Sequence, residues 1–194
     1  HELETILRLH RRGAGGMRVA LALTTRLDRL IRGVYRNIEG PGKTLLSIVA
    51  LGGYGRKELC FSSDTDIMFL IESDDHKNDA SIAVQQLLHR LLDYGLDIGH
   101  SFRTIGECLE FSVTDFESWN SLLESRLICG NQSTYKTLRS GIANRVRSYD
   151  QSDYVRNLLN AMQIRHRKYG NSTKLLEPNI KNSAGGLRDL HSVL

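Results

Sequence analysis

Two carboxylates spaced two residues apart are the feature of this sequence with the clearest chemical meaning. Asp64 and Asp66 stand at the start of an apolar run that continues to Ile71. In a β-strand, residues two apart project from the same face, so the two carboxylates point the same way and Thr65 points away. Carboxylate oxygens are preferred ligands of Mg²⁺ and Mn²⁺, and ions held in this way assist phosphoryl displacement. The spacing therefore predicts a metal site at Asp64 and Asp66.

A glycine pair precedes these carboxylates by ten residues. Gly52 and Gly53 follow a short apolar segment, residues 45–51, which predicts a buried strand. Glycine lets backbone N–H groups approach a triphosphate without a Cβ in the way, and Arg56 adds positive charge nearby. A glycine pair alone is usually only a turn, and an Asp-x-Asp pair alone is usually a solvated strand entrance. Together, at this spacing, they favour a nucleotide site.

A second glycine-containing segment does not predict a phosphate site. Gly42-Lys43-Thr44 matches the end of a P-loop, but Asn37 occupies the position of the first glycine of that motif. The segment also precedes its strand, whereas a P-loop joins a strand to a helix. We therefore reject a P-loop in this chain.

The elements that must position these residues form a small α/β unit. Hydrophobic periodicity predicts helices within 1–40, strands at 45–51, 65–71 and 96–104, and a helix at 78–94 between the last two strands. From residue 105 onward we expect helices at 105–111, 114–128, 131–148 and 151–169, a loop over 170–184 and no further strand. This divides the chain into N-terminal helices (1–40), an α/β core (41–112) and a helical subdomain (113–194).

Composition indicates an ordinary globular protein. The chain has 194 residues, of which 40% are hydrophobic and 25% charged, with a net charge of +4 that is too small to predict nucleic-acid binding. No apolar run is long enough to span a membrane, and no secretory signal is evident at the start. The three cysteines, Cys60, Cys108 and Cys129, lack metal-knuckle spacing and are odd in number. We therefore expect a cytoplasmic protein without disulfides or membrane contact.

Three segments resemble the bacterial PII-uridylyltransferase family, within the nucleotidyltransferase superfamily that includes DNA polymerase beta. The first is Ala50–Leu59 with Ser63–Asp66, which is similar to the active-site block of the family. The second, Gly99–Thr104, resembles its GHSxRT segment. The third, Leu176–Lys181 with Gly185–His191, resembles its EPxIK…GGLRDxH block. The resemblance covers nearly the whole chain and implies a polymerase-beta-like small mixed sheet with flanking helices, followed by a helical subdomain.

The resemblance also implies a reaction. A tyrosine hydroxyl of the PII signalling protein attacks the α-phosphorus of UTP, and pyrophosphate leaves. Asp64 and Asp66 are the expected metal ligands, and Asp97 is our candidate for the third carboxylate that superfamily members usually supply, often as general base. The candidate nucleotide contacts are Gly52, Gly53, Arg56, Ser63, Lys181 and Arg188.

Several alternatives remain open from the sequence. Glutamine synthetase adenylyltransferases share the Asp-x-Asp arrangement, and a catalytically silent relative would bind nucleotide or a partner protein without turnover. Retention of both Asp64 and Asp66 favours an active enzyme. Within the third strand, alternation places Asp97, Gly99 and Ser101 on one face and His100 on the other, where we expect a core histidine. A shift of one residue would exchange the two faces.

Overall fold

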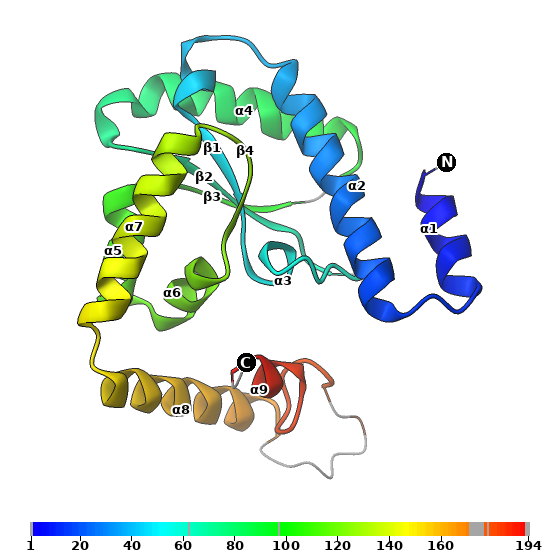
Figure 1. Cartoon of the computed structure of the whole chain (residues 1–194), viewed down its shortest axis with the longest axis vertical. Coiled ribbons are helices and arrows are strands. Elements are labelled where there is room, and N and C mark those ends of the chain that lie inside the picture. The colour runs from blue at the N-terminus through cyan, green and yellow to red at the C-terminus, as the bar shows by residue number, and fades with distance from the viewer. Residues whose placement is uncertain (1, 62, 97, 171–176, 178, 193–194) are drawn as a thin grey trace.

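A four-stranded mixed sheet forms the centre of the molecule in a computed structural model of the chain (Figure 1). The structure describes residues 2–61, 63–96, 98–170, 177 and 179–192. The strands are β1 (Ser47–Ala50), β2 (Asp66–Ile71), β3 (Gly99–Thr104) and β4 (Arg126–Gly130), in the spatial order β3-β2-β1-β4. β1 is antiparallel to β2 and to β4, whereas β2 and β3 are parallel.

The fourth strand corrects the sequence prediction. We expected a helix over 114–128 and no strand after residue 105, but α6 (Phe116–Leu123) ends early and Arg126–Gly130 pairs with β1. The segment is short, and its five residues alone do not distinguish a strand from a helical continuation. The deciding influence is tertiary, because β1 offers a free edge and Ile128 becomes buried there. The sheet therefore extends beyond residue 112, while the division of the chain into domains stays a prediction.

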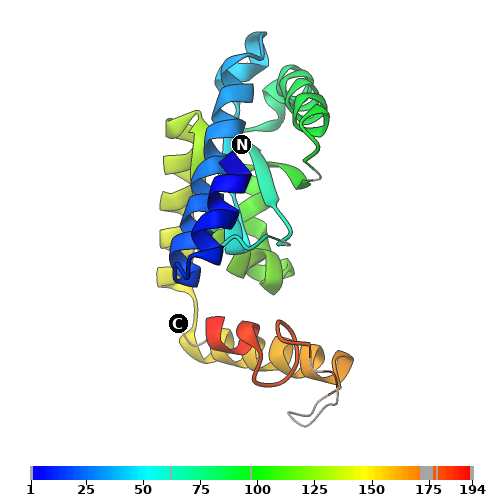
Figure 2. The same cartoon turned by 90° about the vertical axis from the view of Figure 1, so that its right-hand side faces the viewer.

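Helices cover both faces of the sheet (Figures 1 and 2). On one face, α2 (Gly16–Arg36) and α4 (Lys77–Asp93) bury their apolar stripes against alternate strand residues such as Ile48, Ile67 and Phe69. On the other face, α5 (Ile105–Thr114), α6 and α7 (Gln132–Ser148) pack against Val49 and Met68. The period-two alternation of β1 and β2 thus serves two separate cores, which explains why both strands are apolar throughout.

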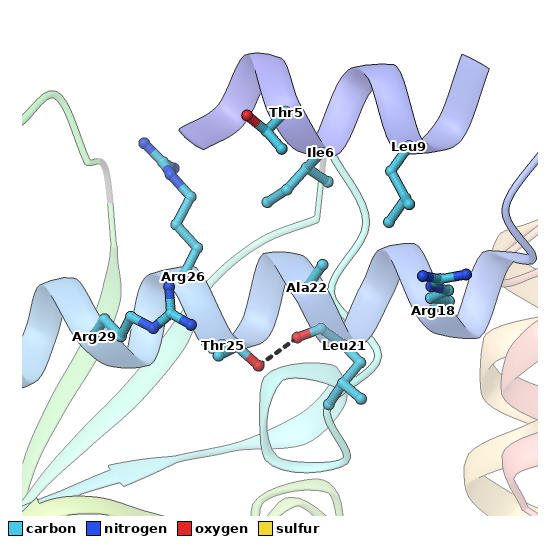
Figure 3. Close-up of a pocket in the computed structure, with 9 residues that line it drawn as sticks. All are labelled: Thr5, Ile6, Leu9, Arg18, Leu21, Ala22, Thr25, Arg26 and Arg29. Atoms are coloured by element: carbon cyan, nitrogen blue, oxygen red, sulfur yellow. Dashed lines mark hydrogen bonds between the residues drawn. The ribbon is translucent and has the colours of Figure 1, made fainter. Parts of the chain in front are cut away.

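Three short elements and one peripheral helix accompany this core. The 3₁₀ helices η1 (Pro41–Leu45) and η2 (Asp74–His76) lead into β1 and α4, and α3 (Gly52–Gly55) follows β1 directly. α1 (Glu2–Arg11) packs along α2 at the edge of the molecule (Figure 2). Between these two helices lies an open groove of about 480 Å³ (Figure 3). Its apolar wall is formed by Ile6, Leu9, Leu21 and Ala22, and Arg18 lies at its rim.

The C-terminal part is helical and lies below α3 and α6 in the view of Figure 1. It consists of α8 (Gln151–Lys168) and α9 (Leu187–His191). Tyr154 attaches α8 to α6, because its hydroxyl donates to Asn120 Oδ1 at 2.9 Å and its ring contacts Phe116. The expected fold class, a small mixed sheet with flanking helices followed by a helical part, is confirmed. Among the described residues, no helix has the length and apolar character required to cross a bilayer.

Candidate functional site

The glycine turn and the Asp-x-Asp pair meet at one corner of the sheet. The backbone N–H of Leu51, which lies between β1 and α3, donates to the carbonyl oxygen of Asp66 at 3.0 Å. This bond places the start of α3 beside the start of β2. The first N–H groups of any helix lack acceptors within that helix, so those at Gly52 and Gly53 can meet an anion. The corner thus combines backbone donors with carboxylates, as the sequence predicts.

The two glycines have different backbone requirements. Gly52 has a φ of +52°, a left-handed conformation that side chains disfavour. Gly53 does not share this conformation, and among the described residues a Cβ added to it would meet Arg56 Nη2 alone, at 3.8 Å. A side chain would therefore be strained at Gly52 and not at Gly53. Space at Gly53 is open in the free protein, so any constraint there comes from a ligand.

Asp64 and Asp66 are both exposed, and the charge of Asp64 acts on the carboxyl group of Asp66. Asp66 opens β2, and its pKa is raised above the usual range by partial burial and by the neighbouring carboxylate of Asp64. The Lys181 ammonium lies 3.6 Å from Asp64 Oδ2 and acts in the opposite direction, lowering the pKa of Asp66. Two hard oxygen donors with incompletely neutralised charge fit a divalent cation. Within the part of the chain that the structure describes, no group of three or more His, Cys, Asp or Glu gathers there.

The third carboxylate, Asp97, lies outside the described residues. Its neighbours define the register: Gly99 pairs with Asp66 and Ser101 with Met68, so Gly99 and Ser101 share the face of Asp66. A Cβ at Gly99 would overlap the Asp66 carboxylate. The predicted alternation of this strand is therefore confirmed from residue 99 onward. Sequence reasoning assigned Gly99 no role, although a glycine opening a strand beside an acidic residue indicates such close approach.

His100 occupies the opposite face of β3, as expected. Its ring meets the edge of Phe69, with the centroids 6.2 Å apart. The side chain is nevertheless exposed, so the expectation of a core histidine is wrong. The physical reason is that β3 is an edge strand of the sheet, and an edge strand is covered less completely than a central one.

Arg56 lies in an ion-pair cluster. Its Nε donates to Glu58 Oε2 at 2.8 Å, and its Nη1 bonds to Glu124 at the end of α6. Its Nη2 lies 3.2 Å from Nδ1 of His191 in α9. The guanidinium thus joins the connection after α3 to two distant helices. A nucleotide-binding role for Arg56 stays a prediction, and these carboxylates compete with phosphate for its charge.

The remaining predicted contacts lie at different distances from this corner. Ser63 stabilises the turn that precedes Asp64, because its hydroxyl accepts a hydrogen bond from the N–H of Cys60 at 2.9 Å. Lys181 reaches Asp64 directly, as described above. Arg188 is exposed on α9, and its N–H donates to the carbonyl oxygen of Lys181 at 3.0 Å, which places the two basic residues on neighbouring backbone segments. Their roles as nucleotide contacts stay predictions.

Asp189 is a structurally important residue that the sequence analysis passed over. His166 Nε2 lies 2.9 Å from its Oδ2, Arg165 bonds to its Oδ1, and the N–H of Gly185 donates to it at 2.7 Å. Although burial alone would raise the pKa of Asp189, these hydrogen bonds lower it below the usual value. Asp189 therefore fixes α9 to the last turn of α8. The signal in the sequence that could have drawn attention to Asp189 was its position directly after Arg188.

Comparison with known proteins agrees with this geometry. The model of the GlnD PII-uridylyltransferase family matches residues 153–194. Bifunctional uridylyltransferase/uridylyl-removing enzymes are similar over most of the chain: that of Photobacterium profundum is 34% identical over 90% of it, that of Cupriavidus metallidurans 36% over 87%, and that of Nitrosospira multiformis 34% over 98%. The chain is homologous to the uridylyltransferase family. It spans about a fifth of the length of these relatives, 20%, 19% and 22% respectively.

Two other matches are weaker. The model of glutamate-ammonia ligase adenylyltransferase matches residues 19–94, which include the glycine turn and the Asp-x-Asp pair. A solved structure titled "Crystal structure of the toxin-antitoxin with AMP-PNP" is 17% identical and covers 71% of this chain and 98% of its own, with a TM-score of 0.35. At that TM-score the likeness carries no argument.

Proposed function

We propose that this chain carries the nucleotidyl-transfer site of a uridylyltransferase, which moves UMP from UTP onto a tyrosine of the PII signalling protein in the cytoplasm. The observation that carries the proposal is the placement of Asp66 beside the α3 turn through the Leu51–Asp66 backbone bond. Homology to enzymes named uridylyltransferase supports the choice of reaction. The net charge of +4 is too small to indicate a nucleic-acid partner, and we propose none.

In this proposal, Asp64 and Asp66 hold Mg²⁺ or Mn²⁺. The ion, when bound, neutralises charge on the triphosphate and on the leaving pyrophosphate. The backbone of Gly52 and Gly53 orients the phosphates, and Lys181 and Arg188 contribute positive charge. The tyrosine oxygen attacks the α-phosphorus, the bond from the α-phosphorus to the pyrophosphate oxygen breaks, and Asp97 accepts the phenolic proton.

A second candidate function is adenylylation of glutamine synthetase. The family match over residues 19–94 favours it, whereas the match over 153–194 favours uridylylation. The test is a panel of UTP, ATP, CTP and GTP, each labelled at the α-phosphate, with Mg²⁺ or Mn²⁺ and with PII or glutamine synthetase as acceptor. We expect metal-dependent label on PII from UTP. Label on glutamine synthetase from ATP would establish the alternative, and no transfer with any pair would indicate a silent module.

A further inference from the structure

A buried polar cluster connects α2 to the underside of the glycine turn. Asp28 of α2 is only 7% exposed, yet it carries a carboxylate. Its Oδ1 accepts from the Tyr54 hydroxyl at 2.7 Å and from Arg126 Nη2 at 3.1 Å. Its Oδ2 accepts from Arg126 Nη1 at 2.8 Å. A carboxylate is stable in such surroundings only when it is paired and hydrogen-bonded, and here both oxygens are satisfied.

The cluster holds α3 by its one large side chain. Tyr54 is the third residue of the four that form α3, and it is 1% exposed. Its ring packs in the core between the sheet and α2, and the Arg126 guanidinium lies 5.3 Å from the ring centroid. Burial and the Asp28 carboxylate both raise the pKa of the Tyr54 hydroxyl, so this hydroxyl remains a donor at physiological pH.

The same arginine also binds the end of α3. Arg126 Nη2 donates to the carbonyl oxygen of Tyr54 at 3.3 Å, and its Nε donates to that of Gly55 at 3.4 Å. The last carbonyl groups of a helix lack N–H donors within that helix. Arg126 donates to two of them in α3, and that of Tyr54 also accepts from the N–H of Lys57 at 3.2 Å. Gly55 lets the segment before β4 come close to α3, because a Cβ there would overlap the backbone of Glu124. Thus α3 is held from beneath by residues of α2 and β4, far from it in sequence.

We propose that Asp28 is a positioning residue, which acts through Tyr54 and Arg126 to hold the α3 turn where nucleotide binding requires it. Asp28 lies on the core side of α3 and touches no reacting group in the proposed function, on which this inference rests. A four-residue helix that begins with a left-handed glycine has little intrinsic stability. The geometry of its first N–H groups therefore depends on contacts from outside, and this cluster supplies them.

The test uses Tyr54→Phe and Asp28→Asn, with Arg32→Gln as the matched control. Arg32 also binds Asp28, at 3.4 Å, but its Nε donates to the carbonyl oxygen of Ile128 and not to α3. The first readout is amide hydrogen exchange at Gly55, Arg56 and Glu58, whose N–H groups donate to the carbonyl oxygens of residues 51–53. We expect exchange about tenfold faster in Tyr54→Phe, because it loses a hydrogen bond to a charged acceptor. Arg32→Gln should leave these rates unchanged.

The second readout is the affinity for UTP with Mg²⁺, measured by calorimetry. We expect it to fall about tenfold in Tyr54→Phe and more in Asp28→Asn, because misplaced binding groups lose much of their effect. The inference would be overturned if amide exchange at α3 were unchanged in Tyr54→Phe, or if exchange rose while UTP affinity stayed the same. It would also be overturned if Arg32→Gln lost as much UTP affinity as Tyr54→Phe. If Asp28→Asn does not fold, Tyr54→Phe decides, since it leaves no buried charge unpaired. Failure of wild-type protein to bind UTP would instead refute the proposed function.

Discussion

At the scale of single residues, the candidate site carries negative charge that the other side chains of the free protein neutralise only in part. Partial burial and the Asp64 carboxylate raise the pKa of Asp66, and the Lys181 ammonium pairs with Asp64 at 3.6 Å while more than half of its side chain remains exposed. Exposed pairs of this kind contribute little to stability. The carboxylates are therefore better explained by a ligand that they bind than by the fold that they support.

The first prediction concerns Asp66→Asn, which removes the charge at nearly constant shape. The pKa of Asp66 is raised in the folded protein, so its ionised form weakens folding at neutral pH and protonation relieves that cost. We expect an unchanged or slightly higher melting temperature without metal, and transfer reduced by about 100-fold or more, as the loss of a metal ligand would cause. Melting curves with and without MgCl₂ and a transfer assay measure both. Normal transfer by this variant would refute the metal assignment.

The glycine pair gives a second prediction, in which folding and binding separate. Gly52→Ala places a side chain at φ +52° and should cost about 1 kcal/mol of unfolding free energy. Gly53→Ala enters open space and should change stability by less than about 0.5 kcal/mol. If the triphosphate approaches the Gly53 backbone closely, Gly53→Ala will nevertheless weaken UTP binding. Denaturant titration and calorimetry on both variants distinguish these effects, and full UTP affinity in Gly53→Ala would argue against the phosphate contact.

Asp97 and His100 form a third comparison. The confirmed register places Gly99 and Ser101 beside Asp66 and His100 on the far face. We expect Asp97→Asn to lower transfer strongly while UTP affinity stays within a few fold, because loss of a general base costs about 10²–10⁴-fold in rate. His100→Ala is the control and should keep its activity. The opposite pattern, an inactive but folded His100→Ala beside an active Asp97→Asn, would remove Asp97 from the mechanism.

At the scale of elements, the sequence predicts what lies within local patterns and misses what depends on partners. The apolar run of β2 and the apolar stripe of α4 are local patterns, and both elements appear in the structure where expected. β4 was missed because its five residues become a strand only by pairing with β1, almost eighty positions earlier. Within the site, the predicted corner of Gly52 and Asp66 is found, whereas the cluster around Asp28 joins three elements that no motif connects.

A fourth prediction tests the pairing of β4. Gly130 has a φ of +100°, and a Cβ there would overlap the backbone of Leu46. We expect Gly130→Ala to lower the unfolding free energy by about 2 kcal/mol or more, since both strain and overlap oppose it. Gly33→Ala is the matched control, because that helical position has open space around it, and it should be neutral or stabilising by up to about 1 kcal/mol. Equal effects in urea unfolding would contradict this account of the strand end.

At the scale of the whole molecule, the C-terminal part closes one side of the candidate site. Lys181 reaches Asp64, and His191 lies between Arg56 and Glu58, 3.2 Å from Arg56 Nη2 and 3.5 Å from Glu58 Oε2. These contacts join residues more than one hundred positions apart, so the sequence could indicate the segments but not their meeting. α9 has only five residues and depends on α8 for its position. The hydrogen bonds of Asp189 hold α9 on α8, and they therefore help to keep His191 in contact with Arg56 and Glu58.

The last prediction follows from the lowered pKa of Asp189. A carboxyl group whose pKa falls on folding stabilises the folded state above its unfolded pKa, and that contribution is lost as pH falls through the folded pKa. Because the shift is downward from 3.8, the contribution should be constant near neutral pH and decline only in the acid range below that value. Asp189→Asn removes the charge that binds Arg165 and His166, and we expect a loss of about 2 kcal/mol of local stability at pH 7.

Amide exchange of α9 in wild type and Asp189→Asn, measured from pH 7 downward, reports this difference directly. The gap between the two proteins should persist to about pH 5 and narrow toward pH 3.8 and below, as Asp189 becomes protonated in the wild type. Asp153→Asn serves as control, because Asp153 pairs with the exposed Arg156 on the same helix and lies far from α9 in sequence. A gap that already closed between pH 7 and 6 would contradict this account, because a carboxyl group whose pKa lies below 3.8 stays ionised throughout that range. The carboxylate would then not be the group that holds α9 in place.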